Sequence, residues 1–205
     1  MPKAYKQHRR RIRSHKKRAR FSSRTLYAGA LLIFVLLVVG WWLGRSNPQT
    51  KYDTRYEVTG TPSVNADFIN RVLDSYGSPA HGKGQALYDL GVKYDIDPVY
   101  ALAFFMHESS FGTTGVAQVT LSLGNIRATD GYASFDGYRQ YHSWEEGFED
   151  WYKLIKVQYV QTWKLSTVDQ IVPVYAPSSD NNDVDAYIQS VENAVTTWRS
   201  GQVQI

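Results

Sequence analysis

From about residue 62 onward, apolar side chains recur three and four positions apart, which predicts a series of amphipathic α-helices. Ser143 and Glu146 form a capping-box pattern that opens one of these helices, and Gly77 and Gly201 are placed to end two others. A shorter helix of at most two turns is predicted from Thr167 to Val172, before Pro173. The predicted inward-facing positions are Phe68, Ile69, Val72, Leu73 and Tyr76; Ala86, Leu87, Leu90 and Tyr94; Trp144, Phe148, Trp151 and Ile155; and Tyr187, Ile188, Val191, Val195 and Trp198.

One helix, beginning after Asp97-Pro98, is apolar on almost every side and is therefore predicted to be buried. Gly112 and Gly115 are placed to stop it, so Glu108 falls in its last turn. Partial burial and the negative end of the helix dipole both disfavour a charged carboxylate there. Glu108 is thus predicted to stay protonated near neutral pH, as the general acid of a glycosidase must. The alternative interpretation is an ordinary exposed Glu at a frayed helix end.

The helical pattern breaks between Val116 and Tyr141, a stretch rich in Thr, Ser and Gly. Apolar and polar residues alternate from Val119 to Leu123, and Asp130-Gly131 is a hairpin-turn signal. The sequence therefore predicts a mostly α domain over residues 62–205, with a small β or irregular lobe inserted after the Glu108 helix. A polar stretch over residues 45–61 is interpreted as a stalk.

Upstream, the eighteen residues 26–43 carry no charge, and as a helix they would span roughly 27 Å, enough to cross a bilayer. Bulky Trp41, Trp42 and Leu43 occupy the place where a cleaved signal peptide would need small residues. Tryptophan pairs are typical of membrane interfaces. We therefore predict an uncleaved transmembrane helix over residues 25–44.

Charge is divided sharply along the chain. Residues 1–24 hold eleven Lys and Arg and no acid, whereas residues 45–205 hold the other 12 of 23 basic residues and all 19 acidic ones, a net charge of 12 − 19 = −7. The basic tail next to a membrane span predicts a cytoplasmic N-terminus, with anionic lipid headgroups as its partners and the domain outside. The acidic domain does not indicate a nucleic-acid partner. The chain has no cysteine, which excludes disulfides and thiol nucleophiles.

Metal and cofactor motifs are weak throughout. His107-Glu108 lacks the second histidine of a zinc-protease helix, because Phe111 stands at that position. The acidic segment 178–185 lacks the glycine of a calcium loop, and Val191 replaces the bidentate Glu, so an Asx-rich turn that caps the last helix is predicted. No metal or organic cofactor is implied.

Aromatic residues also occur in the polar, Gly-rich segment, where they more often face a ligand than a core. Sugar rings stack on such faces, so the segment favours a carbohydrate cleft. These aromatic residues are Tyr132, Phe135, Tyr138 and Tyr141.

Four segments, in the same order along the chain, resemble the peptidoglycan glucosaminidase domains of the mannosyl-glycoprotein endo-β-N-acetylglucosaminidase family. Residues 101–115, ALAFFMHESSFGTTG, resemble the family's ALA-x-x-x-x-ES-x-x-GTSG segment. Residues 124–127, GNIR, resemble a shortened NLFGIK, and residues 135–150 resemble FRKY-x-S-x-EES-x-x-D. Residues 175–187 resemble YATDPxY with an insertion.

The resemblance implies a lysozyme-like fold and cleavage of a β-1,4 bond after N-acetylglucosamine. Glu108 falls on the family's catalytic acid, and Tyr175 falls on an aromatic residue that lines its active site. The implied substrate-binding positions are Ser109, Asn125, Tyr138 and Tyr141.

The chain departs from the family between Glu108 and Tyr138, where the family carries a second acidic residue. Only Asp130 and Asp136 are available in this segment. Asp130, in a Gly-flanked turn, is the predicted second catalytic residue, and a plain turn Asp is the alternative. A substrate N-acetyl group that attacks by itself would need no second carboxylate.

The sequence therefore predicts a bacterial, single-pass, membrane-anchored peptidoglycan hydrolase with its catalytic domain outside the membrane. Its partners would be peptidoglycan glycan strands, and the lipid bilayer through one helix. The alternatives are a non-catalytic glycan-binding or scaffold module of the cell wall, and a lytic transglycosylase on the same fold.

Overall fold

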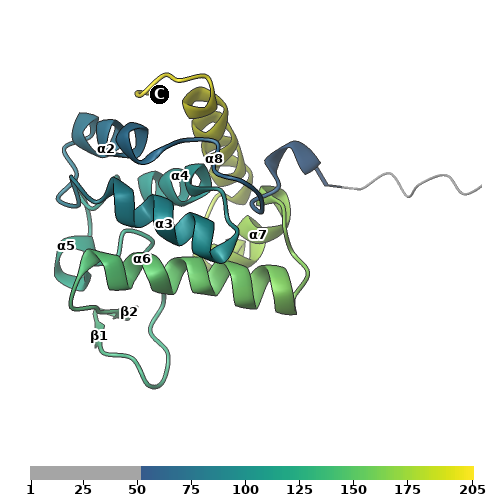
Figure 1. Ribbon diagram of the computed structural model, residues 1–205. Coiled ribbons are helices and arrows are strands. Elements are labelled where there is room, and N and C mark those ends of the chain that lie inside the picture. Colours follow the sequence, from purple (N-terminus) through teal and green to yellow (C-terminus); the bar gives the residue numbers. More distant parts are fainter. Residues whose placement is uncertain (1–51) are drawn as a thin grey trace, which may run out of the picture. The chain divides into compact units, whose positions relative to one another are not determined.

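The computed structural model describes residues 52–205 (Figure 1). The predicted basic tail (1–24), the predicted membrane span (25–44) and residues 45–51 of the predicted stalk lie outside the described residues. Within residues 52–205, no helix combines the length and the hydropathy that a membrane crossing requires.

This part of the chain is mostly helical and contains one pair of short strands, which confirms the predicted mostly α domain with a small β lobe. The transmembrane helix that completes the predicted fold class stays a prediction. The π-helix η2 continues directly from α6. The elements are η1 (Thr54–Tyr56), α2 (Ala66–Ser75), α3 (Gly84–Tyr94), α4 (Pro98–Ser109), α5 (Ala117–Thr120), β1 (Ser134–Phe135), β2 (Tyr138–Arg139), α6 (Trp144–Lys153), η2 (Leu154–Thr162), α7 (Val168–Tyr175), η3 (Ser178–Asp180) and α8 (Val184–Arg199).

Helix α4 lies at the centre, packed against α3 and α8 (Figure 1). Every residue from Pro98 to Phe105 is buried, which explains why the helix is apolar on all sides. The side chain of Asp97 caps the helix by accepting a hydrogen bond from the Val99 backbone N–H, at 3.2 Å. This burial holds α4 in place in the core, and Glu108 lies in the last turn of this helix.

The amphipathic helices pack around α4 with the predicted faces inward. Phe148 and Trp151 of α6 are buried, and Trp151 lies across Phe105 with ring centroids 5.2 Å apart. Ser143 caps α6 by accepting from the Glu146 N–H, but the Glu146 carboxylate accepts from the N–H of His142, so only half of the capping box forms as predicted.

Two helix ends differ from the prediction. Helix α4 ends at Ser109, and the next residue, Ser110, adopts the left-handed conformation with φ 47°, so the helix stops before Gly112. Helix α7 continues through Pro173 to Tyr175 instead of stopping before the proline. Pro173 follows the first turn of α7, so it removes only one hydrogen bond from the helix.

The small lobe is partly α-helical and partly β. The alternating segment from Val119 to Leu123 was predicted to be extended, but its first residues belong to α5. The hairpin pairs Ser134 with Arg139 and Phe135 with Tyr138. Its turn is Asp136-Gly137 and not the predicted Asp130-Gly131, since both turn residues have the positive φ, 49° and 82°, that a type I′ turn requires.

The segment from Asp53 to Thr61 packs onto the domain, although the sequence assigned it to the stalk. Val58 is buried, its N–H donates to the Ser166 carbonyl at 2.8 Å, and its carbonyl accepts from the Asp97 N–H at 3.0 Å. The folded region therefore begins before residue 62.

Candidate active site

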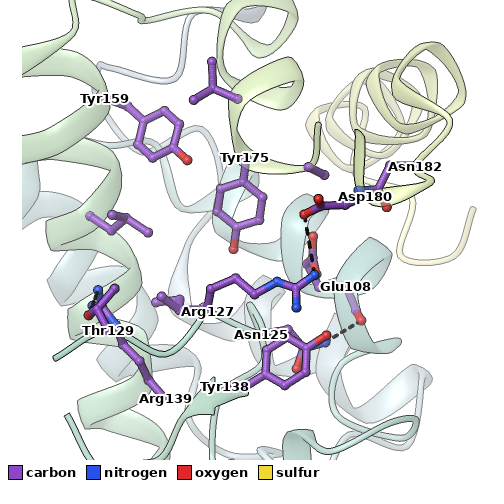
Figure 2. A pocket seen from close by; sticks show the side chains of 14 residues that line it. Glu108, Asn125, Arg127, Thr129, Tyr138, Arg139, Tyr159, Tyr175, Asp180 and Asn182 are labelled. Atoms are coloured by element: carbon purple, nitrogen blue, oxygen red, sulfur yellow. Dashed lines mark hydrogen bonds and ion pairs between the residues drawn. The ribbon is translucent and has the colours of Figure 1, made fainter. Parts of the chain in front are cut away.

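Glu108, the second-last residue of α4, opens onto a cleft of about 320 Å³ (Figure 2). The other walls come from the segment before β1, from β2, from η2, from α7 and from the turn that follows α7. The volume is in the range of sites that bind small ligands or sugar units. The cleft is thus assembled at the end of the buried helix, as the sequence predicted for Glu108.

The environment of Glu108 favours its protonated form. Burial raises the pKa of this carboxyl from 4.5 to about 7, while a hydrogen bond from Tyr187 and the charge of Arg127 lower it by less. A large fraction of Glu108 is therefore protonated at neutral pH. The protonation state agrees with the sequence prediction, and the catalytic role of Glu108 stays a prediction.

Tyr187 on α8 makes the direct contact with this carboxyl. Its phenol donates to Oε1 of Glu108 at 2.6 Å. Burial raises the pKa of Tyr187 well above its ordinary value, so the phenol keeps its proton. The ring of His107 stacks on Tyr187, with centroids 3.6 Å apart and planes at 19°, and so holds the phenol ring in place.

Asn125 joins the end of α4 to the segment before β1. Its side-chain amide donates to the backbone carbonyl of Glu108 at 2.8 Å. Asn125 has a φ of 46°, a left-handed conformation that asparagine tolerates better than most residues. The predicted binding residue therefore lines the cleft and also fixes the backbone of Glu108.

Tyr175, at the end of α7, lines the cleft as predicted. Its phenol donates to the Gly124 carbonyl at 2.5 Å, and its ring meets Phe104 edge-on, with centroids 5.3 Å apart. Figure 2 shows Tyr175 and Tyr159 facing the same space. The Tyr175 hydroxyl is therefore tied to the segment that carries Asn125.

Tyr138 on β2 lines the cleft together with Arg127, whose guanidinium carbon lies 5.3 Å from the centre of the Tyr138 ring. Arg127 also forms an ion pair with Asp180 at 3.6 Å (Figure 2). Asp180 comes from the turn after α7, in the segment that the family motif lacks. The cleft therefore contains a second carboxylate besides Glu108, held by an arginine.

Three of the predicted site residues do not line this cleft. Ser109 is buried and its hydroxyl donates to the Leu123 carbonyl and accepts from the Gly112 N–H, so it supports the turn after α4. Tyr141 donates to Asp150 at 2.6 Å and lines a separate hollow with Tyr132. Asp130 is exposed on the loop before β1, outside the cleft lining, and its catalytic role stays a prediction.

Several residues of the site were not predicted from the sequence. Tyr187, which contacts Glu108 from the core, was assigned to the core by its helical spacing, and only its alignment with the last Tyr of YATDPxY could have indicated a second role. Arg127 was part of a quoted motif but received no function. Asp180 was assigned to a turn, and Tyr159, on the unpredicted π-helix, carried no signal.

The arrangement supplies acid chemistry with polar and aromatic walls. Glu108 can donate a proton to a bound ligand, and the tyrosines offer faces on which a sugar ring can stack. Within residues 52–205, no group of three or more His, Asp or Glu side chains is placed to hold a metal ion.

Comparison with known proteins assigns the chain to a family. Residues 84–201 match the family described as mannosyl-glycoprotein endo-beta-N-acetylglucosaminidase. None of the curated proteins compared matches the sequence.

Solved structures show the same fold. The structure of S. aureus autolysin E in complex with muropeptide NAM-L-Ala-D-iGlu has a TM-score of 0.50 and 14% identity, over 70% of this chain and 72% of that one. The S. aureus autolysin E structure described without a ligand has a TM-score of 0.50 and 13% sequence identity, over 70% of this chain and 71% of that one. At these identities the likeness concerns the fold alone, and it supports the lysozyme-like architecture that the sequence predicted.

Proposed function

Because this chain belongs to the mannosyl-glycoprotein endo-β-N-acetylglucosaminidase family, a family of glycoside hydrolases, we propose that it hydrolyses peptidoglycan at the β-1,4 bond after N-acetylglucosamine. Glu108 is the general acid in this proposal. The observation that carries it is the raised pKa of about 7 for a carboxyl that opens onto a tyrosine-lined cleft. Such a group is still protonated at the pH where the reaction must run.

In the proposed reaction, Glu108 gives its proton to the glycosidic oxygen and the bond from that oxygen to the anomeric carbon breaks. The hydroxyl of the departing sugar leaves neutral, and Glu108 becomes a carboxylate. Tyr187 then stabilises this carboxylate by the hydrogen bond it already donates. A water molecule finally adds to the anomeric carbon, and its proton restores Glu108.

Two aspartates are candidates for a second catalytic group. Asp130 is one candidate, on a loop whose Gly131 gives it freedom to move, although Asp130 lies outside the cleft lining. Asp180 lies within the lining, but Arg127 holds its carboxylate. Glu108 is therefore the carboxyl in the cleft without an ion-pair partner among the described residues. This arrangement favours attack by the N-acetyl group of the substrate, which needs no second carboxylate.

The proposed substrate and location rest on further observations. Autolysin E, which shares the fold, was solved in complex with a muropeptide, and the sequence segments quoted above resemble peptidoglycan glucosaminidases. The uncharged residues 26–43, after a tail of eleven basic residues, favour a bacterial membrane anchor with a cytoplasmic N-terminus and an external domain. Peptidoglycan lies on that side of the bacterial membrane.

The test compares the purified full-length chain with its Glu108→Gln variant on isolated peptidoglycan. The released fragments are analysed by mass. Fragments with reducing N-acetylglucosamine ends from the unsubstituted chain, and a loss of roughly 10²-fold or more in the variant, are expected for a general acid. Full activity of Glu108→Gln would exclude the mechanism.

Two other outcomes correspond to the alternative functions. Anhydro-sugar ends would identify a lytic transglycosylase, which the single unpaired carboxyl in the cleft also fits. Sedimentation with peptidoglycan without any cleavage, by folded protein of both sequences, would identify a binding module.

A further inference from the structure

Arg127 is an exposed cation at the cleft that contains Glu108. Its side chain is 68% exposed, and its ion pair with Asp180 is long, 3.6 Å, with Asp180 itself 46% exposed. Ion pairs of this kind contribute little to stability, because water and salt screen them. The guanidinium thus remains available to a better partner.

The other arginine of the cleft is not available. Arg139 donates to Asp150 at 2.7 Å and to Thr129 at 2.8 Å, and its side chain is only 12% exposed. A ligand anion in this cleft would therefore meet Arg127 first, because Arg127 has one weak ion-pair partner among the described residues, whereas Arg139 would first have to release Asp150.

Arg127 is also positioned by its surroundings. Its backbone pairs with Tyr138 of β2, and its guanidinium lies 5.3 Å from the centre of the Tyr138 ring. Figure 2 shows the guanidinium between Asp180 on one side and the Tyr138 ring on the other, directed toward the space in front of Glu108. A planar guanidinium fixed in this way can bind a carboxylate with two parallel hydrogen bonds.

We propose that Arg127 binds a carboxylate of the substrate and that the Asp180 carboxylate occupies this position when the cleft is empty. The inference rests on the proposed function, and it names the substrate class more closely as an anionic glycan with a carboxylate near the scissile bond. A carboxylated glycan then gains the contact with Arg127 but must displace Asp180 from it, whereas an uncharged glycan gains nothing from Arg127.

The test measures selectivity on one glycan in two charge states. Peptidoglycan strands are used intact and after their carboxylates have been converted to neutral amides, and the ratio of kcat/KM for intact over amidated strands is determined with the full-length chain. Arg127→Gln is expected to lower this ratio roughly three- to tenfold, the range of an exposed charge-assisted contact. Asp180→Asn is expected to raise it roughly twofold or more, because the competitor is removed.

The kcat/KM ratio separates the effect of Arg127 on binding of the substrate carboxylate from its effect on the pKa of Glu108. Loss of Arg127 also raises the pKa of Glu108, but that change affects both substrates and cancels in the ratio. Arg55→Gln is the matched control, because Arg55 forms a similar exposed ion pair with Asp53 outside the cleft, and its ratio should equal that of the unsubstituted chain.

Equal losses on both substrates in Arg127→Gln would overturn the inference. A lower ratio in Asp180→Asn would also overturn it, since Asp180 would then position Arg127 instead of competing for it. Arg127→Gln and Asp180→Asn are also combined with Glu108→Gln, and the dissociation constants of intact and amidated strands are compared. This ratio of dissociation constants tests the inference even if the chain cleaves neither substrate. Strands without peptides carry their carboxylates on the sugar. Measuring the effect of Arg127→Gln on these strands shows whether Arg127 binds the sugar carboxylate or a carboxylate of the peptide.

Discussion

The phenol of Tyr187 donates a 2.6 Å hydrogen bond to Oε1 of Glu108, although 79 positions separate the two residues in the sequence. Burial and this bond act on the carboxyl in opposite directions, since burial favours the neutral form and the bond favours the charged form. Burial is the larger effect. The balance leaves the pKa of Glu108 at about 7, where the group can both give and regain a proton.

Tyr187→Phe should therefore raise the pKa of Glu108 above about 7. Activity requires the protonated carboxyl, so it falls as pH rises through that pKa, and the alkaline limb of the kcat/KM profile should move to higher pH. Tyr56→Phe is the control, because the Tyr56 phenol bonds to Thr196 instead of to Glu108. An alkaline limb that moves down or stays in place would contradict the assignment of Tyr187.

Glu108→Gln should make the domain more stable at alkaline pH. The pKa of Glu108 is raised by folding, so its contribution to stability is present below pH 4.5 and is lost as pH rises through about 7. Because glutamine does not ionise, the variant does not lose this contribution. Its free energy of unfolding at pH 8 should exceed that of the unsubstituted chain by up to about 3 kcal/mol. Urea unfolding at pH 4 and pH 8 measures the difference, and a gap that does not widen with pH would refute it.

Asn125→Ala should cost more stability than Asn125→Gly. Both variants lose the hydrogen bond to the Glu108 carbonyl, about 1 kcal/mol, but alanine also meets a left-handed φ of 46°, about 1 kcal/mol more. Both should lower kcat/KM by roughly tenfold, because the backbone under the general acid loosens. Urea unfolding and initial rates test this, and equal unfolding free energies would show that the backbone conformation is not strained.

Tyr141→Phe should reduce stability by about 1 kcal/mol and leave KM unchanged, although the family resemblance assigned Tyr141 to the substrate. Its phenol bonds to Asp150, which also pairs with Arg139, a side chain that is 12% exposed. Asp150→Ala should cost about 2–3 kcal/mol, because it leaves the charge of this largely covered arginine without its carboxylate partner. A raised KM in Tyr141→Phe, at unchanged stability, would restore the original assignment.

Gly147→Ala should destabilise the domain by at least about 2 kcal/mol. A Cβ atom there would lie 2.2 Å from the backbone carbonyl oxygen of Leu121, so α6 would have to move away from the lobe that carries β1 and β2. Gly82→Ala is the control for glycine conformation, because its site is open but its φ is +75°, and it should cost about 1 kcal/mol. Thermal unfolding of both variants decides whether close packing or backbone conformation dominates.

Much of the helical core was predictable because its signals are local. The apolar sequence of α4, the Asp97-Pro98 start and the spacing of apolar residues in α8 each follow from a single segment. The raised pKa of Glu108 was predictable for the same reason, since it needs only a carboxyl at the end of a buried helix.

The contacts of the phenol groups around the site, and the turn of the hairpin, were not predictable in this way. A tyrosine has an apolar ring and a polar hydroxyl, so helical spacing can place the rings of Tyr187 and Tyr141 but does not indicate which partner each hydroxyl bonds to. The chain offers two Asp-Gly turns, and only strand pairing selects Asp136-Gly137 over Asp130-Gly131. The π-helical hydrogen bonding of η2 likewise depends on packing against the rest of the domain.

The position of Tyr187 on α8 has a consequence for the order in which the protein becomes active. Helix α8 supplies the partner of the general acid and packs against α4, so a ribosome-bound chain that ends before residue 187 contains Glu108 but not its hydrogen-bond donor. The complete site therefore forms only after α8 has been synthesised and has packed against α4. The environment of the general acid thus depends on a contact between two helices that are far apart in the sequence.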